Sequence, residues 1–112
     1  MGVIIGGKRL CGKTTDLIKR SNKEWLYIVV ANNQHADNIV RLAREMEIDI
    51  PYPITFDELP LSPRSKIKGV LIDEIEIVLE QLVHRPIIAA STSYEMIEMD
   101  SLIENKGGVM HE

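Results

Sequence analysis

The hydrophobic pattern of this chain consists of short apolar runs, which are separated by stretches in which apolar residues recur at the spacing of a helix. Four runs, at residues 3–5, 25–31, 70–72 and 87–90, are almost wholly apolar, as expected of strands that helices cover on both faces. Residues 54–56 predict a further short strand, inside an otherwise irregular stretch in which prolines break any longer element. The sequence therefore predicts four to five strands.

Between these runs, apolar residues recur with the spacing of helices. One helix is predicted over about residues 13–22 and a second after Asn32 and Asn33, which can cap it. A third helix follows Glu74, and a fourth is predicted over about residues 94–104. The second helix has its apolar positions at Ala36, Ile39, Leu42, Ala43 and Met46, and the third at Ile75, Val78, Leu79, Leu82 and Val83.

The alternation of strands and helices is typical of an α/β fold with an open, mostly parallel sheet. The 112 residues predict one domain, with a core over 1–93 and a C-terminal helix and tail over 94–112. Ligands of such sheets bind at the carboxyl ends of the strands. Because Gly7, Asp73 and Ser91 each follow a predicted strand, we expect these three positions to converge on one edge.

The residues after the first strand match the phosphate-binding pattern G-x-x-x-x-G-K-[ST] at every fixed position. In such a loop the backbone N–H groups and the helix N-terminus bind phosphates, the lysine reaches the β- and γ-phosphates, and the hydroxyl binds Mg²⁺. These roles fall on Lys13 and Thr14. The expected nucleotide-binding residues are Gly7, Lys8, Arg9, Leu10, Cys11, Gly12, Lys13, Thr14 and Thr15.

Two adjacent acids follow the apolar run 70–72. Asp73 is placed to bind Mg²⁺, and Glu74 is placed to polarise a water molecule that attacks the γ-phosphate, so that Glu74 and Lys13 are the expected catalytic residues. The alternative is that the acids only cap the following helix and complement its dipole. The phosphate-binding loop upstream favours the catalytic interpretation.

Composition and charge narrow the function classes. The net charge of −4 argues against a protein that coats nucleic acid by bulk charge, although residues 1–24 hold six Lys or Arg against two acids. One cysteine permits no internal disulfide, and no apolar run reaches 18 residues. We expect a cytoplasmic protein without a membrane span or leader.

Taken together, the loop and the Asp73-Glu74-Ile75-Glu76 box resemble the P-loop NTPases that carry an additional catalytic glutamate. Within that class, the run Arg9 to Thr15 is similar to the loop of phage DNA-packaging terminase motors, and residues 29–33 resemble superfamily 1 and 2 helicases. The resemblance implies a minimal three-layer P-loop NTPase fold with a γ-phosphate sensor at Ser91 or Thr92. It also implies Mg²⁺ with ATP or another nucleoside triphosphate as substrate. The same resemblance implies a protein that a phage or a mobile element encodes, with a bacterial host cell as its place if the source is a phage.

The resemblance further implies a function in DNA translocation, packaging or remodelling. The chain has no apparent adenine-recognising segment, second motor lobe, nuclease domain or fifth strand beyond the P-loop strand. An arginine finger would therefore come from a larger motor or replication complex or from self-association, and turnover by the isolated chain should be slow.

Two other functions stay open. A small P-loop kinase would phosphorylate a nucleotide or metabolite, which a test of phosphate transfer would reveal, although no arginine-rich lid follows residues 87–90. A binding module would use the nucleotide only to order a surface for a partner protein. Loss of partner binding in Glu74→Gln, without measurable turnover in the parent, would indicate that module.

Several other residues are candidates for function but are better explained otherwise. Cys11 is expected to be a variable loop position rather than a redox switch. The three histidines lack the spacing of metal ligands, and Trp25 and Tyr27 are expected to pack rather than stack on bases. The basic cluster at residues 64–68 is expected to be a solvated loop, with contact to a nucleic-acid backbone as the alternative.

Overall fold

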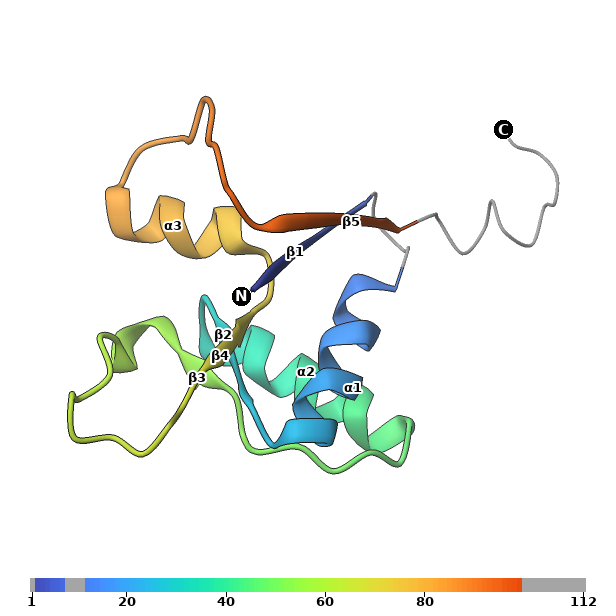
Figure 1. The fold of residues 1–112 in the computed structure, drawn as a ribbon. Helices are drawn as coiled ribbons and strands as arrows, with labels where there is room; N and C mark the ends of the chain where they lie inside the picture. The colour runs from blue at the N-terminus through green and yellow to red at the C-terminus, as the bar shows by residue number, and fades with distance from the viewer. Residues whose placement is uncertain (1, 8–11, 100–112) are drawn as a thin grey trace, which may run out of the picture. The chain divides into compact units, whose positions relative to one another are not determined.

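The computed structural model describes residues 2–7 and 12–99 of the chain. In order, the elements are β1 (Val3–Gly7), α1 (Lys13–Glu24), β2 (Tyr27–Val30), α2 (Asn33–Glu45), β3 (Ile54–Thr55), the short 3₁₀ helix η1 (Phe56–Glu58), β4 (Val70–Ile72), α3 (Ile75–Val83) and β5 (Glu95–Met99) (Figure 1). The protein is therefore an α/β protein, as the sequence predicts. It divides into two compact units, Met1–Asp16 with Ala89–Glu112, and Leu17–Ile88.

The first unit contains a two-stranded parallel sheet. β1 pairs with β5 in a register that runs from Val3 opposite Glu95 to Gly7 opposite Met99. Gly2 lies against Tyr94, because a Cβ atom at Gly2 would come within 2.6 Å of Cε2 of that ring. The sheet thus joins the two ends of the described chain.

The second unit contains a three-stranded parallel sheet in which β2 lies between β3 and β4. Ile28, Val29 and Val30 are almost completely buried, which confirms the prediction of an interior strand. Each such side chain stabilises the fold by about 1.5–3 kcal/mol relative to an exposed one. The same core holds Ile18, Ala36, Ile39, Ala43, Ile54 and Val78.

The helix α2 follows its sequence pattern closely. Ala36, Ile39 and Ala43 are buried at the predicted positions. The side-chain oxygen of Asn32 accepts a hydrogen bond from the backbone N–H of His35, with 2.9 Å between Oδ1 and N, and so caps the helix as predicted. Its 13 residues begin and end where local signals place them.

The C-terminal part of the described chain differs from the sequence prediction. Residues 87–90 form no strand, and Glu95–Met99 is the strand β5 where a helix over 94–104 is predicted; residues 100–104 lie outside the described part. Glu and Met favour helix locally, but parallel pairing with β1 bonds the backbone of this segment instead. The predictions of a strand over residues 87–90 and of a helix over residues 95–99 were therefore wrong.

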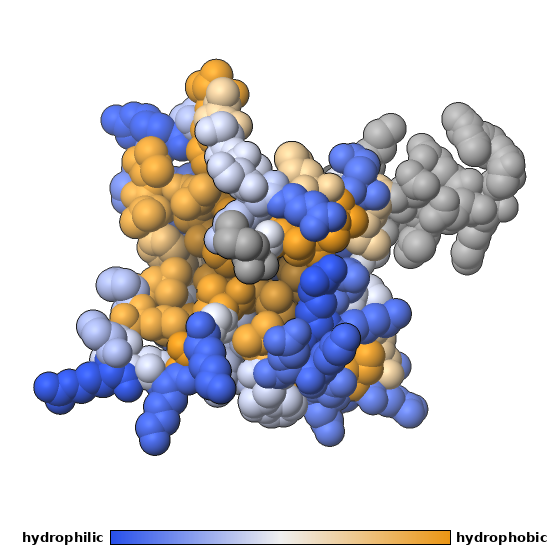
Figure 2. Space-filling view, viewed as in Figure 1, coloured by the Kyte–Doolittle hydropathy of each residue, from blue (hydrophilic) through white to orange (hydrophobic). Residues whose placement is uncertain are grey.

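The described sheets and the third helix also differ from the sequence prediction. The sequence predicts one mostly parallel sheet, whereas the described strands are hydrogen-bonded in two sheets. The predicted core face of the third helix is largely exposed, because on α3 only Val78 is buried. Figure 2 shows hydrophobic residues on the surface over this helix. The exposed apolar residues of α3 are Ile75, Ile77, Leu79, Leu82 and Val83. No described helix has both the length and the apolar composition that crossing a membrane requires.

Candidate functional site

Gly7 at the end of β1 and Gly12 just before α1 have conformations that other residues rarely adopt. Gly7 has a φ of 148° and Gly12 has a φ of 90°. A Cβ at Gly12 would lie 3.7 Å from Cε of Met99, an ordinary contact, so the backbone angle and not the space requires glycine there. Residues 8–11 of the predicted nucleotide loop lie outside the described residues.

Lys13 is the first residue of α1, and its ammonium group donates a hydrogen bond to the carbonyl oxygen of Gly7. Lys13, which directly follows Gly12, thus bonds to the backbone of Gly7, the first glycine of the motif. The backbone N–H of Asp16 donates to the carbonyl oxygen of Gly12 at 2.9 Å, which starts the helix directly after the turn. A cationic side chain and the positive end of a 12-residue helix therefore lie together beside the turn.

The two hydroxyl residues of the motif occupy the first turn of the same helix. Thr14 and Thr15 follow Lys13 within α1 and are half-buried. The position of Thr14 agrees with the motif, in which this hydroxyl lies one residue after the lysine at the start of the helix. Gly7, Gly12, Lys13 and Thr14 thus lie at the end of β1 and the start of α1, in the first unit.

In the second unit, Asp73 directly follows β4 and is only 4% exposed. Its backbone N–H donates to the carbonyl oxygen of Val29 at 3.1 Å, which continues the β2–β4 pairing by one residue. Its carboxylate contacts a residue that sequence reasoning did not select: Oδ2 of Asp73 lies 2.9 Å from Nε2 of His35. A carboxylate thus directly follows β4, where the sequence places it, and the structure shows that this carboxylate is buried.

His35 belongs to the first turn of α2, beside the end of β2. The hydrogen bond to Asp73 raises the pKa of the His35 imidazole; burial opposes this change, and the negative charges of Asp73 and Glu74 reinforce it. The order of the strands in the sheet could have pointed to this pair of residues. His35 comes three residues after the Asn32 cap, and β2 and β4 are neighbours in the sheet, so both residues follow adjacent strands at the same edge.

Glu74 occupies the N-cap position of α3 with a left-handed backbone, φ 57° and ψ 63°. Its side chain makes no capping hydrogen bond and is exposed, while its carbonyl oxygen accepts from the N–H of Ile77 at 2.9 Å. A left-handed residue other than glycine costs roughly 1 kcal/mol or more. The alternative in which this acid serves to cap the helix with its carboxylate is therefore wrong for Glu74.

The predicted sensor residues lack their predicted setting. Ser91 and Thr92 are exposed and follow no strand, because residues 86–93 have no regular structure. The Thr92 hydroxyl oxygen instead accepts a hydrogen bond from the backbone N–H of Tyr94 at 3.0 Å. This bond forms a local turn just before β5, which explains the hydroxyl run without a ligand.

The donor set expected for Mg²⁺ fits the chemistry of that ion. Thr14 and Asp73 offer a hydroxyl and a carboxylate, the hard oxygen ligands that Mg²⁺ takes in small number beside phosphates and water. Among residues 2–7 and 12–99, no group of three or more His, Cys, Asp and Glu is arranged to hold a metal by itself.

The structure brings together Lys13 with Gly7 in one unit and Asp73 with His35 in the other. The expected convergence of Gly7, Asp73 and Ser91 on one edge stays a prediction. No protein-family model, no curated protein and no solved structure matches this chain.

Proposed function

We propose that this chain binds a nucleoside triphosphate with Mg²⁺, with ATP as the expected nucleotide, and hydrolyses it. The observation that supports the proposal best is the bond from Lys13 to the carbonyl oxygen of Gly7, because Gly7 and Gly12 both have a positive φ. A cation, the N-terminus of α1 and two glycines of positive φ thus lie together. Each of the three features favours a polyphosphate.

Phosphate binding would replace a weaker bond of Lys13 by stronger ones. In the structure the ammonium group donates to a neutral carbonyl oxygen of Gly7. Phosphate oxygens carry negative charge, so a bond from the ammonium group to phosphate adds an attraction between opposite charges that the bond to a neutral carbonyl lacks. Lys13 would therefore turn to the β- and γ-phosphates when a nucleotide enters.

The proposal assigns the hydrolytic step to the acids that follow β4. Thr14 and Asp73 would hold Mg²⁺, which supplies charge neutralisation on the phosphates. The carboxylate of Glu74 would accept the proton of a water molecule whose oxygen forms a bond to the γ-phosphorus. The bond from that phosphorus to the β-phosphate oxygen breaks, giving nucleoside diphosphate and phosphate. Exposure of the Glu74 side chain agrees with access to water.

The three-layer P-loop NTPase fold and a coupling of hydrolysis to DNA belong to the same proposal. Both derive from the resemblance of the two motifs to terminase motors and helicases. DNA coupling predicts that ATP turnover rises when single- or double-stranded DNA is added. A turnover that DNA leaves unchanged would remove the motor function and leave nucleotide hydrolysis itself in place.

Nucleotide binding and hydrolysis are tested with three variants. Lys13→Ala should weaken binding of a fluorescent ATP analogue about 10- to 100-fold, as expected for loss of a charge-assisted bond. Lys19→Ala, which changes an exposed lysine of the same helix, is the matched control and should bind like the parent. Glu74→Gln should keep binding while turnover falls about 10²- to 10⁴-fold.

A fourth variant asks whether both units serve one nucleotide. Asp73→Asn should reduce the gain in ATP affinity that Mg²⁺ produces in the parent, as measured with and without a chelator. If Lys13→Ala binds as tightly as Lys19→Ala, the proposed nucleotide site is wrong. If Asp73→Asn keeps the full effect of Mg²⁺, the assignment of the metal ligand is wrong.

A further inference from the structure

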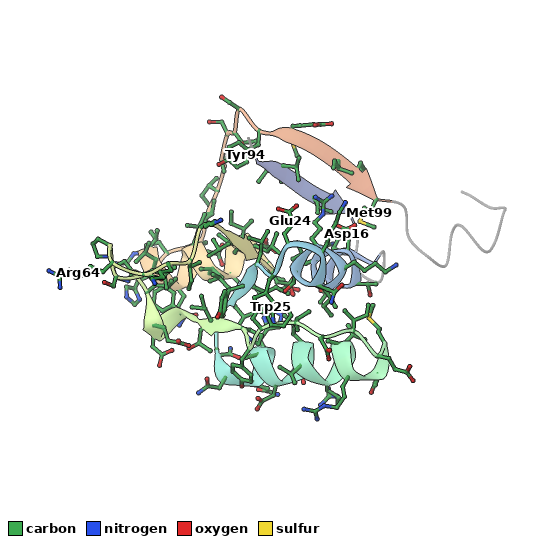
Figure 3. The ribbon with its side chains drawn as sticks, turned by 60° about the horizontal axis from the view of Figure 1, so that its bottom comes forward. Asp16, Glu24, Trp25, Arg64, Tyr94 and Met99 are labelled. Carbon is green, nitrogen blue, oxygen red and sulfur yellow. The ribbon has the colours of Figure 1, made fainter. Side chains whose placement is uncertain are left out.

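Trp25 lies on the surface, although the sequence predicts that it packs. It follows the last residue of α1 (Figure 3). Its φ of 56° is left-handed, and the residue is 53% exposed. The turn is held from both sides, because Leu26 N–H donates to the carbonyl oxygen of Ser21 at 3.1 Å, and Ser21 Oγ donates to that of Leu26 at 2.6 Å. Trp25 therefore lies in a turn before β2 and not in the strand itself, and its side chain stays accessible to solvent.

The ring lines a cavity of about 330 Å³ within the second unit, which we name the Trp25 pocket. Its walls are the segment Glu24–Tyr27, which enters β2, and the segment Lys66–Gly69, which enters β4. Tyr27 and Val70 are register partners, so the pocket lies beyond the amino ends of the two strands. Asp73 lies at the opposite, carboxyl end of the same sheet, so the Trp25 pocket is separate from the carboxylate that is expected to bind Mg²⁺.

The chemistry of the Trp25 pocket favours a ligand that is both flat and anionic. Lys66 and Lys68 supply two exposed cations against the single acid Glu24, and the indole and Tyr27 supply aromatic surface. Gly69 adds no side chain, and a Cβ there would meet nothing within 4 Å, so the rim beside the lysines is open. Arg64 extends from the same loop away from the ribbon and adds a third cation nearby in sequence (Figure 3).

We propose that the Trp25 pocket binds single-stranded nucleic acid, with a base stacked on Trp25 and the backbone phosphates contacted by Lys66 and Lys68. Aromatic stacking accepts every base, and lysines beside the ring follow the phosphates without reading sequence. A duplex keeps its bases stacked on one another and cannot offer a face to the indole. The inference goes beyond the nucleotide site and needs no nucleotide, so either proposal can fail alone.

Because Trp25 is the only tryptophan of the chain, its own fluorescence reports the contact. The full chain is titrated with a labelled oligo-dT strand at low salt without nucleotide, and anisotropy and tryptophan emission are recorded together. Binding should quench the emission. Trp25→Ala should weaken binding about 5- to 150-fold, as expected when one stacked base is lost, and Trp25→Phe should retain part of the affinity.

The lysines are tested by the salt dependence of binding. Lys66→Gln with Lys68→Gln should lower the slope of log affinity against log salt by about 1.4, which corresponds to two phosphate contacts on a single strand. The control changes two exposed cations elsewhere in the unit, Lys19→Gln with Arg44→Gln, and should leave the slope unchanged. Circular dichroism of every variant checks that it folds like the parent.

Three results would overturn the proposal. The first is a parent chain that does not bind the strand at low salt. The second is binding that neither quenches Trp25 nor weakens in Trp25→Ala, and the third is equal affinity for the duplex. An acidic peptide that quenches Trp25 while the oligo-dT strand does not would assign the pocket to a protein partner instead.

Discussion

The contact between His35 and Asp73 makes a quantitative prediction about stability. We expect His35→Ala to lower the free energy of unfolding because it removes a hydrogen bond to a carboxylate that is only 4% exposed. Bonds to charged groups contribute about 1.5–3 kcal/mol. The His35 side chain is itself 24% exposed, so solvent weakens the pair, and we expect a loss of about 1.5–2 kcal/mol near pH 6.

The loss should depend on pH in a direction that the structure determines. The pKa of His35 is raised in the folded protein, chiefly by the hydrogen bond to Asp73. A group with a raised pKa binds its proton more tightly in the folded protein than in the unfolded chain. Its contribution to the free energy of unfolding is therefore complete below the pKa of the unfolded chain, about 6.5 for histidine. The contribution decreases as the pH rises through the folded pKa, where a neutral hydrogen bond worth about 1 kcal/mol remains.

Urea unfolding, followed by circular dichroism between about pH 5.5 and about pH 9 in a buffer with chelator, measures both effects. This window stays above the range in which carboxylates ordinarily titrate. Gln34→Ala, an exposed neighbour in the same helical turn, is the control and should change stability by less than about 0.5 kcal/mol. A loss in His35→Ala that equals the control, or that stays constant across the pH range, would refute the pairing.

Two further predictions concern the core and the helix cap. Ile28 is 0% exposed and Ile88 is 90% exposed, so Ile28→Ala should cost about 2–5 kcal/mol and Ile88→Ala less than about 0.5 kcal/mol in the same urea assay. Equal costs would mean that residues 87–90 pack inside, as their apolar pattern suggests. Asn32→Ala should cost about 1 kcal/mol through loss of the cap on α2, whereas Asn33→Ala, at an exposed position, should be nearly neutral; a neutral Asn32→Ala would contradict the cap.

The secondary structure of a segment could be predicted from sequence where its local pattern favours the same conformation that it has in the folded protein. The run that contains Ile28 is apolar at every position and lies in the middle of a sheet. The helix α2 has both a capping residue and helical apolar spacing, and it formed where both place it. The glycine-bounded turn before Lys13 and the carboxylate after β4 also follow from short patterns, because each depends on residues adjacent in the chain.

Features that depend on distant partners needed the tertiary structure. Residues 95–99 favour a helix by themselves, and only pairing with β1, about 90 residues away, makes them a strand. The bond between His35 and Asp73 exists because β2 and β4 are neighbours, and no spacing along the chain reveals that. Trp25 reads as part of an apolar strand, but the left-handed turn after α1 exposes it. Local sequence therefore determined elements such as β2 and α2 and the match to the phosphate-binding pattern. Strand pairing decided the fate of residues 95–99 and which side chains meet, because sequence spacing does not specify nonlocal contacts.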